Sequence, residues 1–338
     1  MWDPLPLRRR IAQRLCEVVQ PEVWVVDDVS FPKCGTTSLG VARQYCGALG
    51  KRANCQVAVS VHAATDAASC PLEWELFPPE EWAHDDRRHQ RAGIPEQAGH
   101  VSKAHLALGL LDRLAAQGLT VPVVVADAGY GRSVSLRLAR RFLEDAGLSY
   151  VVAVPKSQQV HGPRIDHLID QAPPEAWQRL SCGDGATGPR LYDWAAARLP
   201  AVWEFDGDEP TRQRRMLARR STTRPDEIAY YLASAPLDIT VADLARIAGC
   251  RWKIEECFQS AKNECGLDQY EVRRYVGWYR HITLVTLAHV FLAAMTVQER
   301  EKGVTRPTHP SSWISPRQKS AVCWQLNPTV ALHGARTQ

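Results

Sequence analysis

The sequence predicts a mixed α/β fold whose sheet is flanked by helices and interrupted by a β-rich insertion. Three observations lead to this prediction. Short apolar runs without a helical period, starting with VWVVDDVSF at residues 23–31, predict an antiparallel meander. After residue 102, helical and strand patterns alternate, which implies a parallel pair of strands. Residues 156–236 then break the alternation with glycine, proline, aromatic residues and many arginines.

Local patterns predict the individual elements. The strands are expected at residues 23–31, 40–46, 54–63, 72–77, 121–126, 149–155 and 230–234. A helix is expected over residues 102–118, because Ser102 can cap its start, leucines recur at helical spacing and Gly118 can end it. Further helices are expected at residues 133–146, 241–263 and 270–302. The highly charged residues 80–101 are expected to form a loop.

These elements group into five segments along the chain. We expect a short leader (1–22), a first core part (23–155), the β-rich insertion (156–236), a helical second core part (237–302) and a basic tail (303–338). The leader has few apolar residues and is too short to form a domain of its own. The tail contains proline, serine and basic residues but no acid, so we expect it to be poorly ordered.

The composition is that of a globular protein. Hydrophobic residues make up 45% of the 338 residues and charged residues 23%, which excludes a disordered tail, a coiled coil and a collagen-like chain. The start of the chain has no apolar stretch typical of a secretory signal, so we expect a cytoplasmic protein whose ten cysteines are free thiols. The net charge of +4 permits a polyanionic partner without requiring one.

Three acids are candidates for a metal site. Asp27 and Asp127 each follow an apolar strand run directly, so their carboxylates would meet at one sheet edge if the strands are neighbours. A helical wheel places Glu255 at the border of an apolar stripe, whereas Glu256 points to solvent. Three carboxylates suit Mg²⁺, which prefers oxygen ligands. Two such ions can stabilise the attacking and the leaving oxygen in a phosphodiester displacement.

The same acids have ordinary structural explanations. An acid after a strand often caps the following turn, and an Arg251–Glu255 pair four residues apart on a helix is often a surface ion pair. Periodicity alone does not decide between these explanations and a metal site. Arg251 and Lys262 share a helical stripe with Glu255, so they are candidates for holding DNA phosphates.

Several segments together resemble the DDE transposases of bacterial insertion sequences, in the branch with a β-strand insertion before the glutamate. These segments are WVVDDVSFPKCG, GVARQYCGALGK, NCQVAVSV, PPEEW, VVADAGYG and RWKIEECFQSAKNECGLDQYEVRRYVGWYRHITL. They extend over about residues 20–300 in the family's order. The resemblance implies a ribonuclease H-like core and places the catalytic, metal-binding acids at Asp27, Asp127 and Glu255.

The sequence matches the family's pattern at some positions and departs from it at others. Arg251 and Lys262 match the family's Arg-Glu-Lys signature, whereas Ala248 stands where the family has a tyrosine that helps to hold the transposon end. Asp28 is the alternative to Asp27, and only one of the two can be central because neighbours on a strand face opposite ways. Family members usually carry a helical, often DNA-binding region before the first strand, and the 22-residue leader cannot form it.

The resemblance also implies a function. A family member uses two Mg²⁺ ions, with Mn²⁺ as a substitute, to hydrolyse the phosphodiester at the element's ends and to transfer the strand to target DNA. It works on the terminal repeats as a homodimer, in the bacterial cytoplasm at the nucleoid. Two alternatives stay open: a Mg²⁺-dependent endonuclease without strand transfer, and a catalytically inert DNA-binding protein derived from a transposase.

Basic residues gather in the insertion and suggest contacts with DNA phosphates. Six arginines fall within thirteen residues, namely Arg212, Arg214, Arg215, Arg219, Arg220 and Arg224. We expect the first five to contact DNA, together with Lys33 in the FPKCG segment. The alternative is a solvated, charged pair of strands, because acids nearby offset part of this charge.

Overall fold

The computed structural model describes residues 2–65, 68–96, 98–130, 143–185, 188–200, 211–303 and 324–325. The chain divides into two compact units, with unit 1 formed by residues 1–121 and 252–305 and unit 2 by residues 122–251 and 306–338. Most of the predicted helix 133–146 and of the predicted tail lies outside the described residues.

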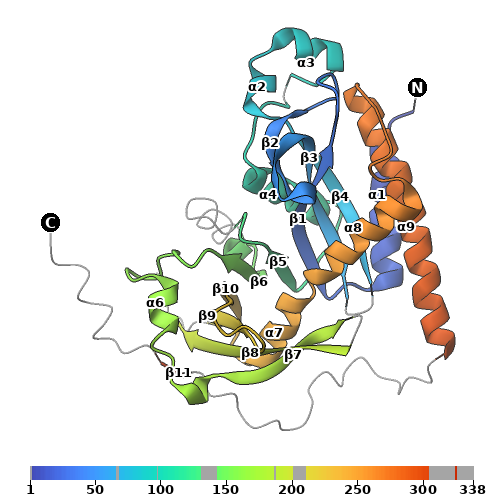
Figure 1. Cartoon of the computed structure of the whole chain (residues 1–338). Helices are drawn as coiled ribbons and strands as arrows, with labels where there is room; N and C mark the ends of the chain where they lie inside the picture. Colours follow the sequence, from blue (N-terminus) through green and yellow to red (C-terminus); the bar gives the residue numbers. More distant parts are fainter. Residues whose placement is uncertain are drawn as a thin grey trace, which may run out of the picture. The chain divides into compact units, whose positions relative to one another are not determined.

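An antiparallel meander forms the sheet of unit 1 (Figure 1). Its strands are β1 (Val23–Pro32), β2 (Ala42–Cys46), β3 (Lys51–Ala64) and β4 (Ser69–Phe77). The long β3 is central, because β1 pairs along one side, β4 along the other, and β2 pairs with its first residues. The predicted meander is therefore confirmed, and the nearly continuous burial of β1 is typical of a strand covered on both faces.

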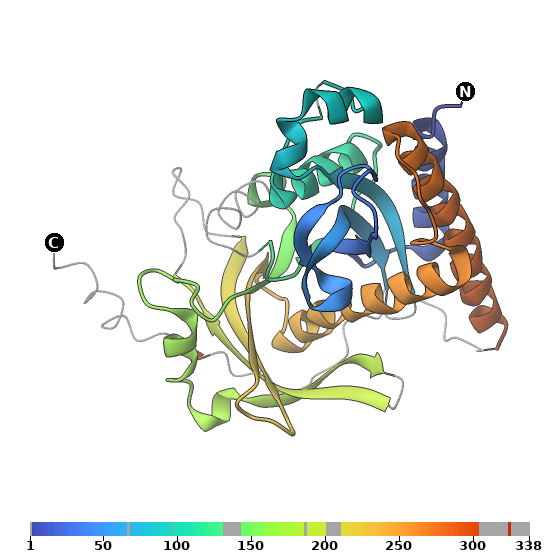
Figure 2. The ribbon, with the colours of Figure 1, turned by 45° about the horizontal axis from the view of Figure 1, so that its top comes forward.

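Helices cover both faces of this sheet (Figure 2). They are α1 (Leu5–Val19), α2 (Glu80–Ala83), α3 (Asp86–Ala92), α4 (Lys103–Ala115), α8 (Trp252–Cys265) and α9 (Tyr275–Gly303), with a 3₁₀ turn η1 (Gly47–Leu49). On one face, Ala261 of α8 and Trp278 of α9 join a buried core with Val29 and Phe31 of β1. The opposite face packs against α4. The helix α1 packs against β3, β4 and α9.

The strands of unit 2 are paired in both parallel and antiparallel fashion. Its elements are β5 (Val123–Ala126), β6 (Ser149–Val154), α6 (Ile165–Ile169), η2 (Pro174–Ala176), β7 (Gln178–Gly185), β8 (Gly188–Arg198), β9 (Arg212–Ser221), β10 (Ile228–Pro236), α7 (Val241–Gly249) and β11 (Trp324–Gln325). The strands β5 and β6 form the predicted parallel pair. From β6 the sheet continues antiparallel through β10, β9 and β8 to β7, and β11 pairs parallel with β8.

The structure corrects three local predictions. Residues 80–101 contain the short helices α2 and α3, which lack a long apolar stripe but are anchored by buried Trp82 and capped by Asp85. The helix expected over residues 241–263 is two helices, α7 and α8. The last long helix begins at Tyr275 and not at residue 270. The leader, for which no element was predicted, contains α1, whose buried residues Ile11 and Leu15 are four apart.

Two global expectations can be compared with the described residues. The cysteines among them are free thiols, as expected from the composition. None of the described helices has the length and hydrophobicity to cross a membrane.

Candidate active site

The strand β1 carries two adjacent acids to opposite faces of the unit 1 sheet. Asp27 lies opposite Ser60 on β3, and cross-strand partners point to the same face. His62, two residues further along β3, also points to this face. The His62 ring lies 5.0 Å from the ring of Phe258 on α8, measured between centroids. Asp27 is therefore on the face that α8 covers.

The surroundings of Asp27 are buried and well ordered by hydrogen bonds. Its side chain is 7% exposed, and Oδ1 accepts a hydrogen bond from the backbone N–H of Asp28 at 2.8 Å. Ser60 Oγ lies 3.4 Å from the Asp27 carbonyl oxygen and 3.0 Å from His62 Nε2. Burial lowers the pKa of His62 to about 3, so this ring is neutral at physiological pH and contributes hydrogen bonding without charge.

Asp28 has a different partner on the opposite face. Its carboxylate forms an ion pair with Lys103 Nζ at the start of α4. The Lys103 ammonium also lies 5.6 Å from the centroid of the Phe77 ring. The Lys103 ammonium thus neutralises the Asp28 carboxylate on the face that α4 covers, whereas Asp27 lies on the face that α8 covers. The sequence analysis did not single out Lys103, although its place at the first position of a predicted helix was a usable signal.

Glu255 lies in the first turn of α8, where the helix dipole favours a carboxylate. The predicted apolar stripe of α8 is confirmed, because Ile254, Cys257 and Ala261 are buried against the unit 1 sheet. Glu255 itself is exposed. Glu256 points away, as predicted, and forms an ion pair with Lys253 at 3.0 Å. Asp27 and the helix that carries Glu255 are therefore on the same side of one sheet.

Asp127 belongs to unit 2 and occupies a turn after the short strand β5. Its Oδ1 accepts a hydrogen bond from the N–H of Gly129 at 2.8 Å, and its carbonyl oxygen accepts one from Tyr130 at 3.2 Å. A side chain at position 129 would meet this carboxylate, since a Cβ atom there would lie 3.0 Å from Asp127 Oδ1. The DAGYG segment therefore fixes the Asp127 carboxylate through a glycine, a role that the sequence analysis did not assign.

Arg251 forms an ion pair with Asp127, with 3.8 Å between Nη2 and Oδ2. It lies in the turn between α7 and α8, so it is not on one helical stripe with Glu255 as predicted. The predicted continuous helix is wrong, because α7 ends at Gly249 and α8 begins at Trp252. Gly249 packs very closely on β7: a Cβ there would lie 2.1 Å from the carbonyl oxygen of Cys182. Ala248, at the family's tyrosine position, is buried in α7.

The two predicted lysines differ in exposure. Lys33 is 7% exposed, its Nζ donates to the carbonyl oxygen of Tyr270 and lies 3.8 Å from the centroid of that ring. Burial lowers the pKa of Lys33, while Glu271, whose Oε1 is 4.0 Å away, raises it. Lys33 is therefore part of the core of unit 1, and its buried ammonium does not fit the predicted contact with DNA phosphates. Lys262 is half-exposed on α8 and forms no ion pair within the described part of the chain.

Three of the five predicted arginines are engaged inside unit 2. Arg212 donates to the carbonyl oxygen of Gly147 and to Ser149 Oγ, at 2.9 and 2.6 Å. Arg214 forms a two-pronged ion pair with Glu144. Arg215 is 4% exposed and donates to the carbonyl oxygens of Ile239 and Leu237, at 2.6 and 3.3 Å. These contacts hold β9 to its neighbours.

Arg219 and Arg220 remain half-exposed at the other end of β9. The Arg219 guanidinium lies 4.6 Å from the ring centroid of Tyr192, and that of Arg220 lies 4.0 Å from the ring centroid of Trp177. Arg220 also forms an ion pair with Asp193 at 3.7 Å. Both Arg219 and Tyr192 line a polar cavity of about 640 Å³ in unit 2.

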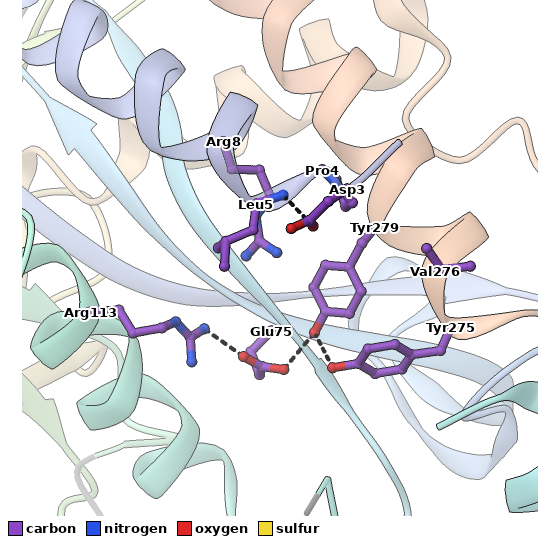
Figure 3. A pocket seen from close by; sticks show the side chains of 9 residues that line it. All are labelled: Asp3, Pro4, Leu5, Arg8, Glu75, Arg113, Tyr275, Val276 and Tyr279. Atoms are coloured by element: carbon purple, nitrogen blue, oxygen red, sulfur yellow. Dashed lines mark hydrogen bonds and ion pairs between the residues drawn. The ribbon is translucent and has the colours of Figure 1, made fainter. Parts of the chain in front are cut away.

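A second cavity, of about 280 Å³, lies in unit 1 and contains none of the predicted site residues (Figure 3). Its polar groups bind one another: Arg113 pairs with Glu75, and Tyr279 donates to Glu75 and accepts from Tyr275. Arg8 also lines it and lies 4.8 Å from the ring centroid of Tyr279. Because these polar side chains bind one another, we assign no catalytic role to this cavity.

The predicted metal ligands have the right chemistry but are divided between the units. Asp27 and Glu255 belong to unit 1, and Asp127 belongs to unit 2. Among the described residues, no three histidine, cysteine or acidic side chains form a ready-made metal site. The donor set consists of carboxylate oxygens, which Mg²⁺ and Mn²⁺ prefer.

Comparison with known proteins identifies the family. The model of a family described as "DDE superfamily endonuclease" matches residues 1–224. The chain belongs to this family. Together with the meander of unit 1 and the parallel pair of unit 2, membership confirms the predicted ribonuclease H-like, mixed α/β fold class. The matched range includes Asp27 and Asp127 and ends before Glu255.

One curated relative is named as a transposase. It is the "Probable transposase for insertion sequence element IS701" of Microchaete diplosiphon, which is 24% identical to this chain over 282 residues. The alignment covers 81% of this chain and 66% of the relative. The chain therefore spans just under two thirds of the length of this relative.

Proposed function

We propose that this DDE-family chain is the transposase of a bacterial insertion sequence. It cuts the phosphodiester at the ends of its element and joins the freed strand to target DNA. The observation that supports this most strongly is the position of Asp27, buried on the sheet face that α8 covers, with Glu255 in the first turn of that helix. The family match and the name of the curated relative point to the same chemistry.

Asp27, Asp127 and Glu255 are the proposed ligands of two Mg²⁺ ions, for which Mn²⁺ can substitute. When bound, such ions stabilise the attacking and the leaving oxygen of a phosphodiester displacement. Asp27 suits this role better than Asp28, because the Asp28 carboxylate is on the opposite face and is neutralised by Lys103. Arg251 holds the Asp127 carboxylate in place before the metal binds.

The proposed reaction has two displacements at phosphorus. In the first, a water oxygen bonds to the phosphorus at the element's end, the bond to the 3′ oxygen breaks, and a free 3′-OH remains. In the second, this 3′-OH attacks a phosphorus of target DNA and displaces another 3′ oxygen there. No covalent intermediate with the protein is needed. Lys262, Arg219 and Arg220 are the half-exposed cations that we assign to DNA phosphates.

The assembly and the location are part of the same proposal. Two element ends must be brought together, so we expect a homodimer on terminal-repeat DNA. We expect the protein in the bacterial cytoplasm, at the nucleoid when it is active.

A strand-transfer assay tests the proposed function. The protein is incubated with Mg²⁺, a labelled duplex carrying the inverted repeats that flank its gene, and a plasmid target. We expect labelled DNA joined to the plasmid. Glu255→Gln should lower product formation about 1,000-fold or more while DNA binding is kept. The matched control is Glu256→Gln, which changes the neighbouring, outward-facing acid and should react like the wild type.

The other outcomes decide between the alternatives. Nicked ends without joined product would identify a Mg²⁺-dependent endonuclease without strand transfer. Binding without any cleavage, even with Mn²⁺, would identify an inert DNA-binding protein. Full activity of Glu255→Gln would show that the glutamate is assigned wrongly.

A further inference from the structure

The strands β2 and β3, joined by η1, form a hairpin (Figure 1). It carries basic residues that none of the proposed catalytic steps uses. No acid occurs between residues 33 and 65, whereas Arg43, Lys51 and Arg52 lie on the hairpin. All three side chains are exposed, and none forms an ion pair with the described residues. This differs from β9, whose arginines have partners inside unit 2.

The strand register puts Arg43, Tyr45 and Arg52 on one face, whereas Lys51, at the start of β3, lies opposite Cys46 and points to the other face. Arg43 and Tyr45 are two residues apart on β2, and Arg52 of β3 lies directly opposite Tyr45. Because alternate residues and cross-strand partners share a face, these three side chains point the same way. Arg52 Nη2 donates to the carbonyl oxygen of Arg43 at 3.1 Å, which keeps its guanidinium against this face. Tyr45 is 63% exposed, an unusual amount for a tyrosine.

The hairpin is held rigidly from its inner side. Cys46, Cys55 and Val57 form a small buried cluster beneath it. Ser30 Oγ on β1 accepts a hydrogen bond from the N–H of Ala48 at 3.0 Å, which fastens the turn to the sheet. A surface that is already ordered loses little conformational entropy on binding.

We propose that this hairpin is a contact surface for the sugar-phosphate backbone of double-stranded DNA. Arg43, Lys51 and Arg52 pair with phosphates, and the Tyr45 hydroxyl donates to a phosphate oxygen. A two-stranded β-ribbon fits the major groove of B-DNA, which is about 12 Å wide. An alternative explanation is that the basic residues prevent this short strand from pairing with a strand of another molecule. That explanation does not account for the exposed Tyr45. The proposal rests on DNA being the partner of this chain.

Fluorescence anisotropy with a short labelled DNA duplex tests the proposal on the full chain. The triple variant Arg43→Gln/Lys51→Gln/Arg52→Gln should bind about tenfold or more weakly than the wild type. Its plot of log affinity against log salt should be less steep by about 2–3 units, because three phosphate contacts are lost. Tyr45→Phe, which removes only the hydroxyl, should weaken binding about two- to fivefold.

A matched control removes the same charge elsewhere in unit 1. Arg9, Arg10 and Arg14 are exposed on α1, and their triple change to Gln lowers the net charge equally. We expect this control to change the salt slope by less than about 1 unit. Wild-type binding by the hairpin variant, or an equal loss in the control, would overturn the proposal while the proposed function stands. A wild-type chain that binds no DNA would overturn both.

Discussion

The strand β9 and the β2–β3 hairpin are both rich in basic residues, yet the structure uses their charges in opposite ways. On β9, Arg214 and Arg215 bind a carboxylate and two backbone carbonyl oxygens inside unit 2. On the hairpin, Arg43 and Arg52 face solvent and have no acidic partner among the residues that the structure describes. The arginines of β9 are the denser cluster in the sequence, yet fewer of them are free to bind a ligand. Whether basic residues can bind DNA depends on which of them lack partners within the protein. The number of basic residues in a segment does not predict this.

The largest effect that separates the two regions should come from Arg215. Arg215→Met keeps most of the volume of a side chain that is 4% exposed but removes the donor to the partly buried carbonyl oxygens of Leu237 and Ile239. We expect the free energy of unfolding to fall by about 2 kcal/mol, because two hydrogen bonds from a charged donor are lost. Urea denaturation measures this. A change within about 0.5 kcal/mol, accompanied by weaker DNA binding, would place Arg215 among the DNA contacts instead.

A smaller effect is expected at Arg214. Its two-pronged pair with Glu144 is partly exposed, with 23% and 20% of the two side chains accessible, so Arg214→Gln should cost about 1 kcal/mol of stability. Arg224→Gln is the control, because its pair with Glu227 is far more exposed, at 70% and 49%. The control should stay within about 0.5 kcal/mol of the wild type in the same urea titration. Equal losses in the two variants would contradict the structural role given to Arg214.

Local patterns were sufficient to predict much of the framework. The β-branched run at Val23–Pro32, the apolar stripe of α8 and the outward direction of Glu256 all follow from periodicities of two or 3.6 residues. Which of Asp27 and Asp28 lies on the face covered by α8 could be seen only in the structure. It depends on which helix covers which face, and hence on His62, Phe258 and Lys103.

The missed features depend on contacts that are distant in the sequence. The close packing of Gly249 in α7 against Cys182 of β7 joins positions 67 residues apart. Lys33 follows a strand like a loop residue, but its ammonium is buried against Tyr270, which is 237 residues away along the chain. The partners of Arg214 and Arg215 are likewise set by tertiary packing. No pattern in a single segment carries that information.

The central claim is that Asp27, and not its neighbour Asp28, acts with Asp127 and Glu255 in phosphodiester cleavage. The most direct test compares Asp27→Asn with Asp28→Asn in single-turnover cleavage of element-end DNA with Mg²⁺. Both changes remove one charge and keep the shape of the side chain. We predict a rate at least about 1,000-fold below the wild type for Asp27→Asn and within about fivefold of it for Asp28→Asn. The reverse order, or equal rates for the two variants, would contradict the assignment.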